Sequence, residues 1–317
     1  IAVIGPGADM VISDWYSGTP PYAVSALQGI TNAAGKNVKI LFAASNKADS
    51  AVLAARQADV AIVCVGNHPL GYGLGWGVNH VASDGREEVD RQALSLEQED
   101  LVKLVHEANP NTVLVIVSSF PYTVNWSKEN IPAILHITQS SQELGNGLAD
   151  VLFGRISPAG RLVQTWPSCI TDLPPILDYD IRNNRTYMYS KNEPLFPFGH
   201  GLTYTSFAWS DLKTGSKSAR AGDTLKVSLE LTNTGEFDSD EVVQLYVSFP
   251  ESEVERPAMA LKGFRRVHVT KGETLEVTIP VVINDLAYWD TERHEFVVEK
   301  GKVIIHAGAS SADLRLQ

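Results

Sequence analysis

Cysteine is scarce in this chain of 317 residues, which has only two. Cys64 lies in an apolar run and Cys169 in a polar one, so the pair predicts neither a disulfide framework nor a metal-ligand spacing. Long hydrophobic runs are also missing, since no stretch approaches the roughly 20 apolar residues that cross a bilayer. The sequence therefore predicts no disulfide scaffold, no cysteine metal site and no membrane-spanning segment.

Basic residues are also fewer than acidic ones. Lys and Arg number 26 against 37 Asp and Glu, which gives a formal net charge of -11. Such a chain is repelled by nucleic-acid phosphates and by an anionic membrane surface. Neutral or cationic partners remain. The chain begins inside an apparent buried strand, Ile1-Ala2-Val3-Ile4, so we expect a fragment or a processed chain.

The first two hundred residues alternate apolar β-branched runs with helical patterns. The runs are IAVIG, VKILFA, ADVAIVCVG, NTVLVIVSS and PAILHIT. Unbroken hydrophobicity of this kind is typical of parallel strands buried on both faces of a sheet. Helices are expected at residues 21–34, 48–58, 96–109 and 142–153. The pattern predicts a layered α/β sandwich with a mostly parallel sheet.

The hydrophobicity pattern changes near Arg220, where strict alternation of apolar and polar residues replaces the helical patterns. Turn signals such as Asn233-Thr234-Gly235 separate the alternating runs, as in an all-β sandwich. A chain of this length is also expected to form two domains. We therefore predict an α/β domain at 1–210, a linker at 211–219 and a β-sandwich at 220–317.

A long loop follows the third apolar run, from Gly66 to the predicted helix at 96–109. Its roughly thirty residues exceed an ordinary connection, and loops of this length are commonly functional. The carboxyl ends of parallel strands also face the ligand crevice of such sheets. Its first carboxylates come together, as Asp84, Glu87, Glu88 and Asp90. The alternative is a charge-paired surface turn, where a helix dipole favours acidic side chains anyway.

Several stretches resemble the C-terminal half of family 3 glycoside hydrolases, in which a barrel precedes an α/β sandwich and a fibronectin type III-like domain. They occur in the family's order along the whole chain: IAVIGPGAD, EEVDRQALSLEQEDLV, AILHITQSSQELGNGLADVLFGRISPAGRLVQTWP, PLFPFGHGLTYTSF and VVQLYVSFPESEVERPAMALKGF. The resemblance predicts a fibronectin type III-like fold for the last domain. The short GPGAD turn lacks the third glycine of a dinucleotide site, which argues against a nucleotide-dependent enzyme.

The resemblance also implies a retaining mechanism, in which a nucleophile and a general acid/base lie about 5 Å apart. The family's EGxDR motif places the acid/base at Glu87, and Glu88, where glycine is usual, is its rival. The nucleophilic Asp comes from the N-terminal barrel. Asp14, in Ser13-Asp14-Trp15, is interpreted as an echo of the barrel's motif and not as that nucleophile. His68 and Trp76 are candidate sugar contacts.

The resemblance implies a β-glucosidase or β-xylosidase that acts on terminal, non-reducing residues and uses no metal or organic cofactor. Its partners are a β-linked oligosaccharide or an aryl or alkyl β-glycoside, together with the barrel of the same enzyme. The chain alone is expected to be inactive, and the family implies a periplasmic or secreted location. The alternative is a non-catalytic carbohydrate-binding or scaffolding protein derived from the same domains.

Overall fold

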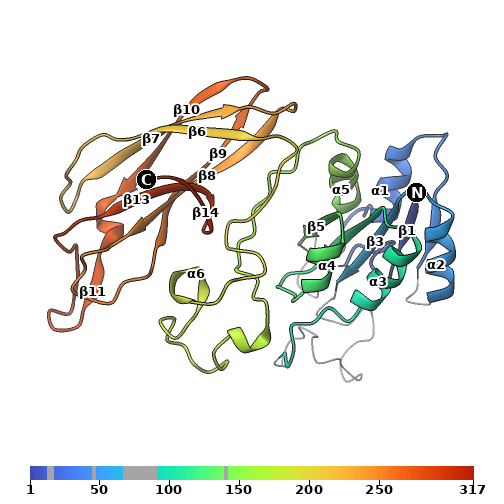
Figure 1. Ribbon diagram of the computed structural model, residues 1–317, viewed down its shortest axis with the longest axis horizontal. Helices are drawn as coiled ribbons and strands as arrows, with labels where there is room; N and C mark the ends of the chain where they lie inside the picture. The colour runs from blue at the N-terminus through green and yellow to red at the C-terminus, as the bar shows by residue number, and fades with distance from the viewer. Residues whose placement is uncertain (13–17, 45–47, 67–90, 139–141) are drawn as a thin grey trace. The chain divides into compact units, whose positions relative to one another are not determined.

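The computed structural model describes residues 1–12, 18–44, 48–66, 91–138 and 142–317 (Figure 1). The chain forms two compact units. Unit 1 contains Ile1–Arg155 and Pro167–Ile170, and unit 2 contains Ile156–Trp166 and Thr171–Gln317. A short 3-10 helix, Ile170–Asp172, spans the last crossing of the chain between the units. Each unit is described below by itself.

Unit 1 is the α/β sandwich that the sequence predicts. Its five strands are parallel and lie in the order β2-β1-β3-β4-β5. They are β1 (Ala2–Ile4), β2 (Leu41–Ala43), β3 (Ala61–Gly66), β4 (Thr112–Val117) and β5 (Ala133–Ile137). All six residues of β3 and five of the six in β4 are buried. Burial on both faces explains why these strands read as unbroken apolar runs.

Within the described residues, five helices accompany this sheet. They are α1 (Ala26–Ala34), α2 (Ala48–Arg56), α3 (Glu99–Ala108), α4 (Asn125–Asn130) and α5 (Leu144–Leu152). Helices α1 and α5 pack together over the face that carries Val3, Cys64 and Val115, while α2 packs against α3 (Figure 1). Helix α1 begins five residues later than predicted because Ser25 caps it, in a reciprocal pair with Gln28.

Helices α1 and α5 approach each other through two glycines. A Cβ on Gly29 would lie 2.0 Å from the Gly145 carbonyl oxygen, and a Cβ on Gly145 would lie 1.9 Å from the Ser25 carbonyl oxygen. The Gly145 amide donates a hydrogen bond of 2.9 Å to the Val24 carbonyl across the same contact. Backbone meets backbone here, so no side chain can yield to make room for a larger residue.

We expect Gly145→Ala to destabilise unit 1 by about 1–3 kcal/mol, the usual cost of overpacking a tight contact. Gly147→Ala is the matched control, since Gly147 lies in the same helix with open space around it. Because alanine favours helices more than glycine does, this control should gain about 0.5–1 kcal/mol. Urea unfolding of both variants measures the difference, and equal stabilities would contradict the close approach.

Unit 2 is built on an antiparallel β-sandwich. One sheet has the order β10-β7-β6 and the other β14-β13-β8-β9, with a separate hairpin β11-β12. The strands are β6 (Phe207–Thr214), β7 (Thr224–Asn233), β8 (Ser239–Ser248), β9 (Ala260–Val269), β10 (Thr274–Val282), β11 (Tyr288–Asp290), β12 (Glu295–Val297), β13 (Ile304–Ser310) and β14 (Asp313–Leu316). Alternate residues such as Val227, Leu229 and Leu231 fill the core. The alternating pattern therefore identified this fold class correctly.

The predicted linker at 211–219 begins inside a strand. Strand β6 pairs with β7 as far as Thr214, and Leu212 packs against the sandwich core. A register shift between Ser210 and Lys213 interrupts the alternation that would mark this strand in the sequence. The first four residues of the predicted linker thus belong to the sandwich.

The segment before β6 also packs with unit 2. This segment includes a four-residue helix α6 (Thr186–Tyr189). Elsewhere in unit 2, a 3-10 helix follows β10 at Ile283–Leu286. Trp166 and Phe196 form an isolated antiparallel bridge, with their rings edge to face at 5.9 Å. By packing, residues 171–206 therefore lie with the sandwich, although the sequence prediction placed them in the α/β domain.

Candidate active site

The long loop singled out by its sequence starts at the carboxyl edge of the parallel sheet. Strand β3 ends at Gly66, beside Val117 at the end of β4. Gly66 has a φ of +145°, and a Cβ there would lie 2.0 Å from the Val117 carbonyl oxygen. Only glycine tolerates both conditions. The chain thus leaves the sheet at the edge where parallel α/β folds bind ligands.

The predicted site residues themselves lie outside the described residues. Glu87, Glu88, His68 and Trp76 fall within 67–90, and Asp14 falls within 13–17. Their roles remain predictions. The structure instead describes the two ends of the loop and the side chains around them.

The loop returns to the same edge at Arg91. The guanidinium Nη1 donates to the Pro121 carbonyl at 3.1 Å, and the guanidinium carbon lies 4.1 Å from the centre of the Phe120 ring. Tyr122 adds a second ring at 5.1 Å. Phe120 and Tyr122 lie three and five residues beyond the end of β4, so both ends of the loop are held near the carboxyl ends of neighbouring strands.

The contact of Arg91 with these aromatic rings was not predicted from the sequence. The signal available was the Phe120-Pro121-Tyr122 triplet directly after a buried strand. Stacking a guanidinium on an aromatic face contributes about 0.5–2 kcal/mol, more when the pair is shielded from water. Through these contacts Arg91 fixes the C-terminal end of the loop.

A half-buried histidine lies at the same edge of the sheet. His136, near the end of β5, has its Nε2 3.0 Å from the Ser118 carbonyl oxygen and 3.3 Å from the Ser118 hydroxyl. Burial lowers the pKa of His136 below its ordinary 6.5, although the hydrogen bond to the Ser118 carbonyl opposes that shift. The neutral ring is therefore the form that the folded chain favours.

This histidine makes the stability of unit 1 depend on pH. Because its pKa is lower in the folded state, the unfolded chain takes up a proton first as the pH falls below about 6.5. We expect the free energy of unfolding to fall with pH from that point, and His136→Asn to flatten the dependence. Urea unfolding between pH 5 and 8 tests this, with the exposed His294→Asn as control. An unchanged slope in His136→Asn would contradict it.

Gln142 and Glu143 stand immediately before the first residue of α5, where capping residues are expected. Glu143 is the N-cap residue, and its carbonyl accepts the Gly147 amide at 3.0 Å. The Gln142 carbonyl accepts the Val24 amide at 2.8 Å and so ties the start of α5 to the segment before α1. The Glu143 side chain makes no capping hydrogen bond. Its carboxylate instead accepts hydrogen bonds from the Tyr22 hydroxyl and, at 2.5 Å, from the Asn146 amide, and these two bonds lower its pKa. The Glu143 side chain therefore links α5 to the segment before α1 and does not cap its helix.

Comparison with known proteins identifies the family of this fold. Residues 1–204 match the glycosyl hydrolase family 3 C-terminal domain. The chain belongs to glycosyl hydrolase family 3. Residues 241–311 match a fibronectin type III-like domain, which identifies the sandwich of unit 2.

Curated relatives in this family carry glycosidase names. A beta-xylosidase of Formosa agariphila is 32% identical over 98% of the chain, which spans 44% of that protein. A periplasmic beta-glucosidase of Salmonella typhimurium is 30% identical over 99% of the chain, and the chain spans 45% of that protein. The family 3 chain is thus similar to these proteins along its own length but spans less than half of theirs.

Solved structures give the same picture. A family 3 beta-glucosidase of Bifidobacterium adolescentis is 30% identical with a TM-score of 0.84, over 99% of this chain and 48% of that one. A beta-D-glucoside glucohydrolase of Trichoderma reesei is 27% identical with a TM-score of 0.87, over 99% and 50%. The chain has the fold of one half of these enzymes.

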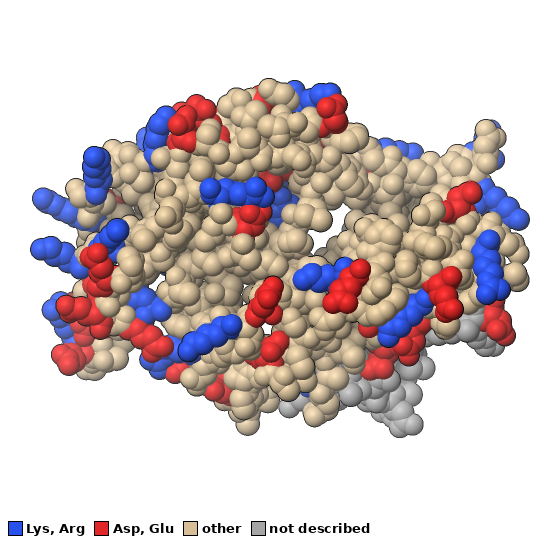
Figure 2. All heavy atoms as spheres, viewed as in Figure 1, with Lys and Arg blue, Asp and Glu red and all other residues tan. Residues whose placement is uncertain are grey.

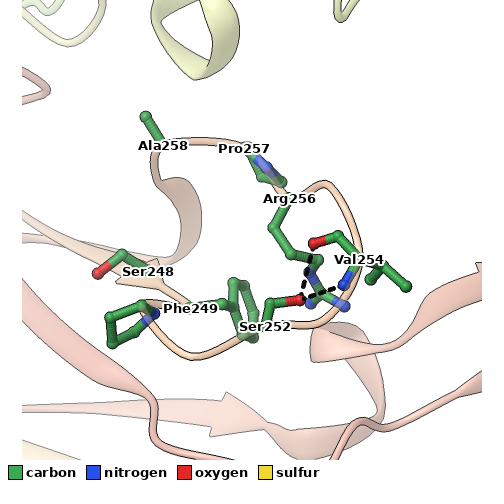
Figure 3. Close-up of a pocket in the computed structure, with 8 residues that line it drawn as sticks. Ser248, Phe249, Ser252, Val254, Arg256, Pro257 and Ala258 are labelled. Carbon is green, nitrogen blue, oxygen red and sulfur yellow. Dashed lines mark hydrogen bonds between the residues drawn. The ribbon is translucent and has the colours of Figure 1, made fainter.

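Unit 2 of the family 3 chain contains a hollow of about 380 Å³ in the loop between β8 and β9 (Figure 3). Arg256 lies along it, with its guanidinium carbon 3.8 Å from the centre of the Phe249 ring and Nη2 donating to the Leu286 carbonyl. Ser252 donates to Glu299 at 2.7 Å. No carboxylate lines this hollow, so it has no candidate for a glycosidase acid/base. Its polar groups hold the loop instead.

Other chemistries find little support. Over the described ranges, no three side chains among His, Cys, Asp and Glu gather as metal ligands. Within those same ranges, no helix combines the length and apolar character needed to cross a membrane. On the face shown in Figure 2, Lys and Arg are interspersed with Asp and Glu, and no cationic tract suited to nucleic acid is seen there. Burial raises the pKa of Cys64 to about 12, which leaves its thiol unreactive.

Proposed function

We propose that this chain supplies the general acid/base half of a retaining β-glycosidase that removes terminal, non-reducing β-D-glucosyl or β-D-xylosyl residues. The observation that carries the proposal is the loop between Gly66 and Arg91, which leaves and rejoins the carboxyl edge of the sheet and carries Glu87 and Glu88. The named activities of the relatives support the substrate class.

The proposed reaction has two steps. An Asp carboxylate of the N-terminal barrel attacks the anomeric carbon, while Glu87 gives its proton to the departing glycosidic oxygen. The glycosyl ester that results is cleaved by water, whose proton passes to the Glu87 carboxylate, and this restores both groups. No metal or organic cofactor takes part. Because the nucleophile comes from the other half, the relatives' double length fits this division.

Glu87 must be protonated at the start of the cycle. Two effects raise the pKa of such a carboxyl: removal from water, and the negative charge of a nucleophile about 5 Å away. Both depend on the loop being held over the sugar-binding cleft. Arg91, stacked on Phe120, fixes one end of the loop and Gly66 the other.

We also propose a periplasmic or secreted location, in line with the name of the Salmonella relative.

The test uses the full-length protein that carries this chain with nitrophenyl β-D-glucoside and nitrophenyl β-D-xyloside. We expect release of nitrophenol, and proton NMR should find the β-anomer of the sugar formed first. If the α-anomer forms first, the retaining mechanism is wrong. Sugar binding without any release would favour the non-catalytic carbohydrate-binding alternative.

A further inference from the structure

Unit 2 exposes a cluster of large apolar side chains on a short segment between the start of the unit and α6. Ile176, Leu177 and Tyr179 are 67%, 79% and 84% exposed. Leu173 and Ile181 extend the cluster with smaller exposed fractions. These five side chains are called the 173–181 face below. Single exposed apolar residues are ordinary, but five within nine residues mark an interaction surface.

Polar side chains bind the backbone of residues 173–181 through hydrogen bonds. The Arg185 guanidinium donates to the Pro175 carbonyl at 2.9 Å and, through Nε, to the Asp178 carbonyl at 2.8 Å. The Asp178 carboxylate accepts the Asp180 amide at 3.1 Å and the Asn183 side chain at 2.8 Å. Polar groups thus bond to the segment itself while apolar groups face outward. A surface fixed in advance loses little entropy on binding.

The segment is rooted in the sandwich through α6. The Tyr187 ring stacks on Phe198 at 4.7 Å, and its hydroxyl accepts the Leu261 amide at 3.0 Å. One residue further on, the Met188 carbonyl accepts the Ala258 amide at 2.8 Å. The 173–181 face therefore belongs to unit 2, together with the fibronectin type III-like sandwich.

We propose that the 173–181 face docks on an apolar surface of the N-terminal half of the enzyme. This inference rests on the division into two halves proposed above, which the relatives' length supports, since the chain spans 44–50% of the relatives compared above. The sandwich would then act as a brace that holds the nucleophile's domain in place beside the acid/base loop.

Size argues for a domain of the same polypeptide over a second copy of the chain. Five side chains fall short of the roughly 800 Å² per partner that a free-standing specific complex buries. A domain linked through the backbone is held at a high effective concentration, so a smaller contact suffices. Interfaces between domains of one chain also tend to be smaller than obligate ones.

The test compares amide hydrogen exchange in the full-length protein and in this 317-residue chain. We expect amides of residues 173–181 to exchange at least tenfold more slowly in the full-length protein. Ile176→Ser with Leu177→Ser should abolish that difference and lower the melting temperature of the full-length protein only. Phe296→Ser, an equally exposed apolar residue on β12, is the matched control and should leave both unchanged.

Equal exchange in the two proteins would overturn the docking, even if the full-length protein hydrolyses glycosides. Protection in an inactive full-length protein would refute the proposed function while the docking stands. Sedimentation of the 317-residue chain covers the remaining occupant: a dimer that Ile176→Ser with Leu177→Ser converts to monomer would assign the face to a second copy and overturn the proposal.

Discussion

Glu87→Gln in the full-length protein is expected to lower kcat on β-glucosides with poor leaving groups by about 10²–10⁴-fold, the usual contribution of a general acid/base. The amide has the shape of the carboxyl but neither donates the proton to the departing oxygen nor accepts one from water. Steady-state rates on an alkyl β-glucoside and on nitrophenyl β-glucoside measure the loss. The nitrophenyl substrate should suffer less in its first step, because its leaving group needs no proton.

Azide distinguishes an acid/base from a residue that merely shapes the site. Azide attacks the glycosyl ester without giving up a proton, so it should restore turnover of nitrophenyl β-glucoside in Glu87→Gln and form β-glucosyl azide. Glu88→Gln is the matched control, one residue away with the same change in charge. If Glu88→Gln shows the loss and the azide response while Glu87→Gln does not, the two assignments are exchanged.

Arg161→Met is expected to destabilise unit 2 by about 3–5 kcal/mol, the cost of breaking a buried ion pair from one side. Arg161 Nη2 lies 2.6 Å from Glu241 Oε1, and the two side chains are only 7% and 6% exposed. Removing the cation leaves the Glu241 carboxylate buried on β8 without its counter-charge. Urea unfolding monitored by tryptophan fluorescence measures the loss.

Two controls define this prediction. Arg155→Met breaks the pair with Asp150, which is far more exposed, and should cost about 0–1 kcal/mol. Arg161→Met combined with Glu241→Leu should recover most of the stability, because an apolar pair of similar volume needs no desolvated charges. A loss in Arg161→Met no larger than that in Arg155→Met would show that the buried pair does not support the sandwich.

The sequence was sufficient for the layers of the fold because each layer has its own period of hydrophobicity. Strands β3 and β4, buried on both faces, read as unbroken apolar runs, and β7 reads as an alternation because one face is buried. Helix starts were placed less well: the third helix begins at Glu99 and not at 96. Apolar spacing continues across a cap, whereas the backbone bonds that define the helix do not.

Contacts between segments that are distant along the chain could not be predicted from the sequence. Nothing in the local pattern pairs Arg161 with Glu241, eighty residues away, or seats Arg91 on Phe120. The Glu143 carboxylate likewise reaches Tyr22, which lies before a different helix. Such pairs follow from the packing of whole elements. The roles of Glu87, Glu88, His68 and Trp76 came from a family motif and remain predictions, since these residues lie outside the described ranges.

The most direct test of the division into two halves is hydrolysis of nitrophenyl β-glucoside and β-xyloside by the 317-residue chain alone, beside the full-length protein. We predict turnover by the full-length protein and none above background by the chain, because we propose that the other half supplies the nucleophile. Turnover by the chain that Asp14→Ala abolishes would contradict the account, because the active site would then be complete within these residues.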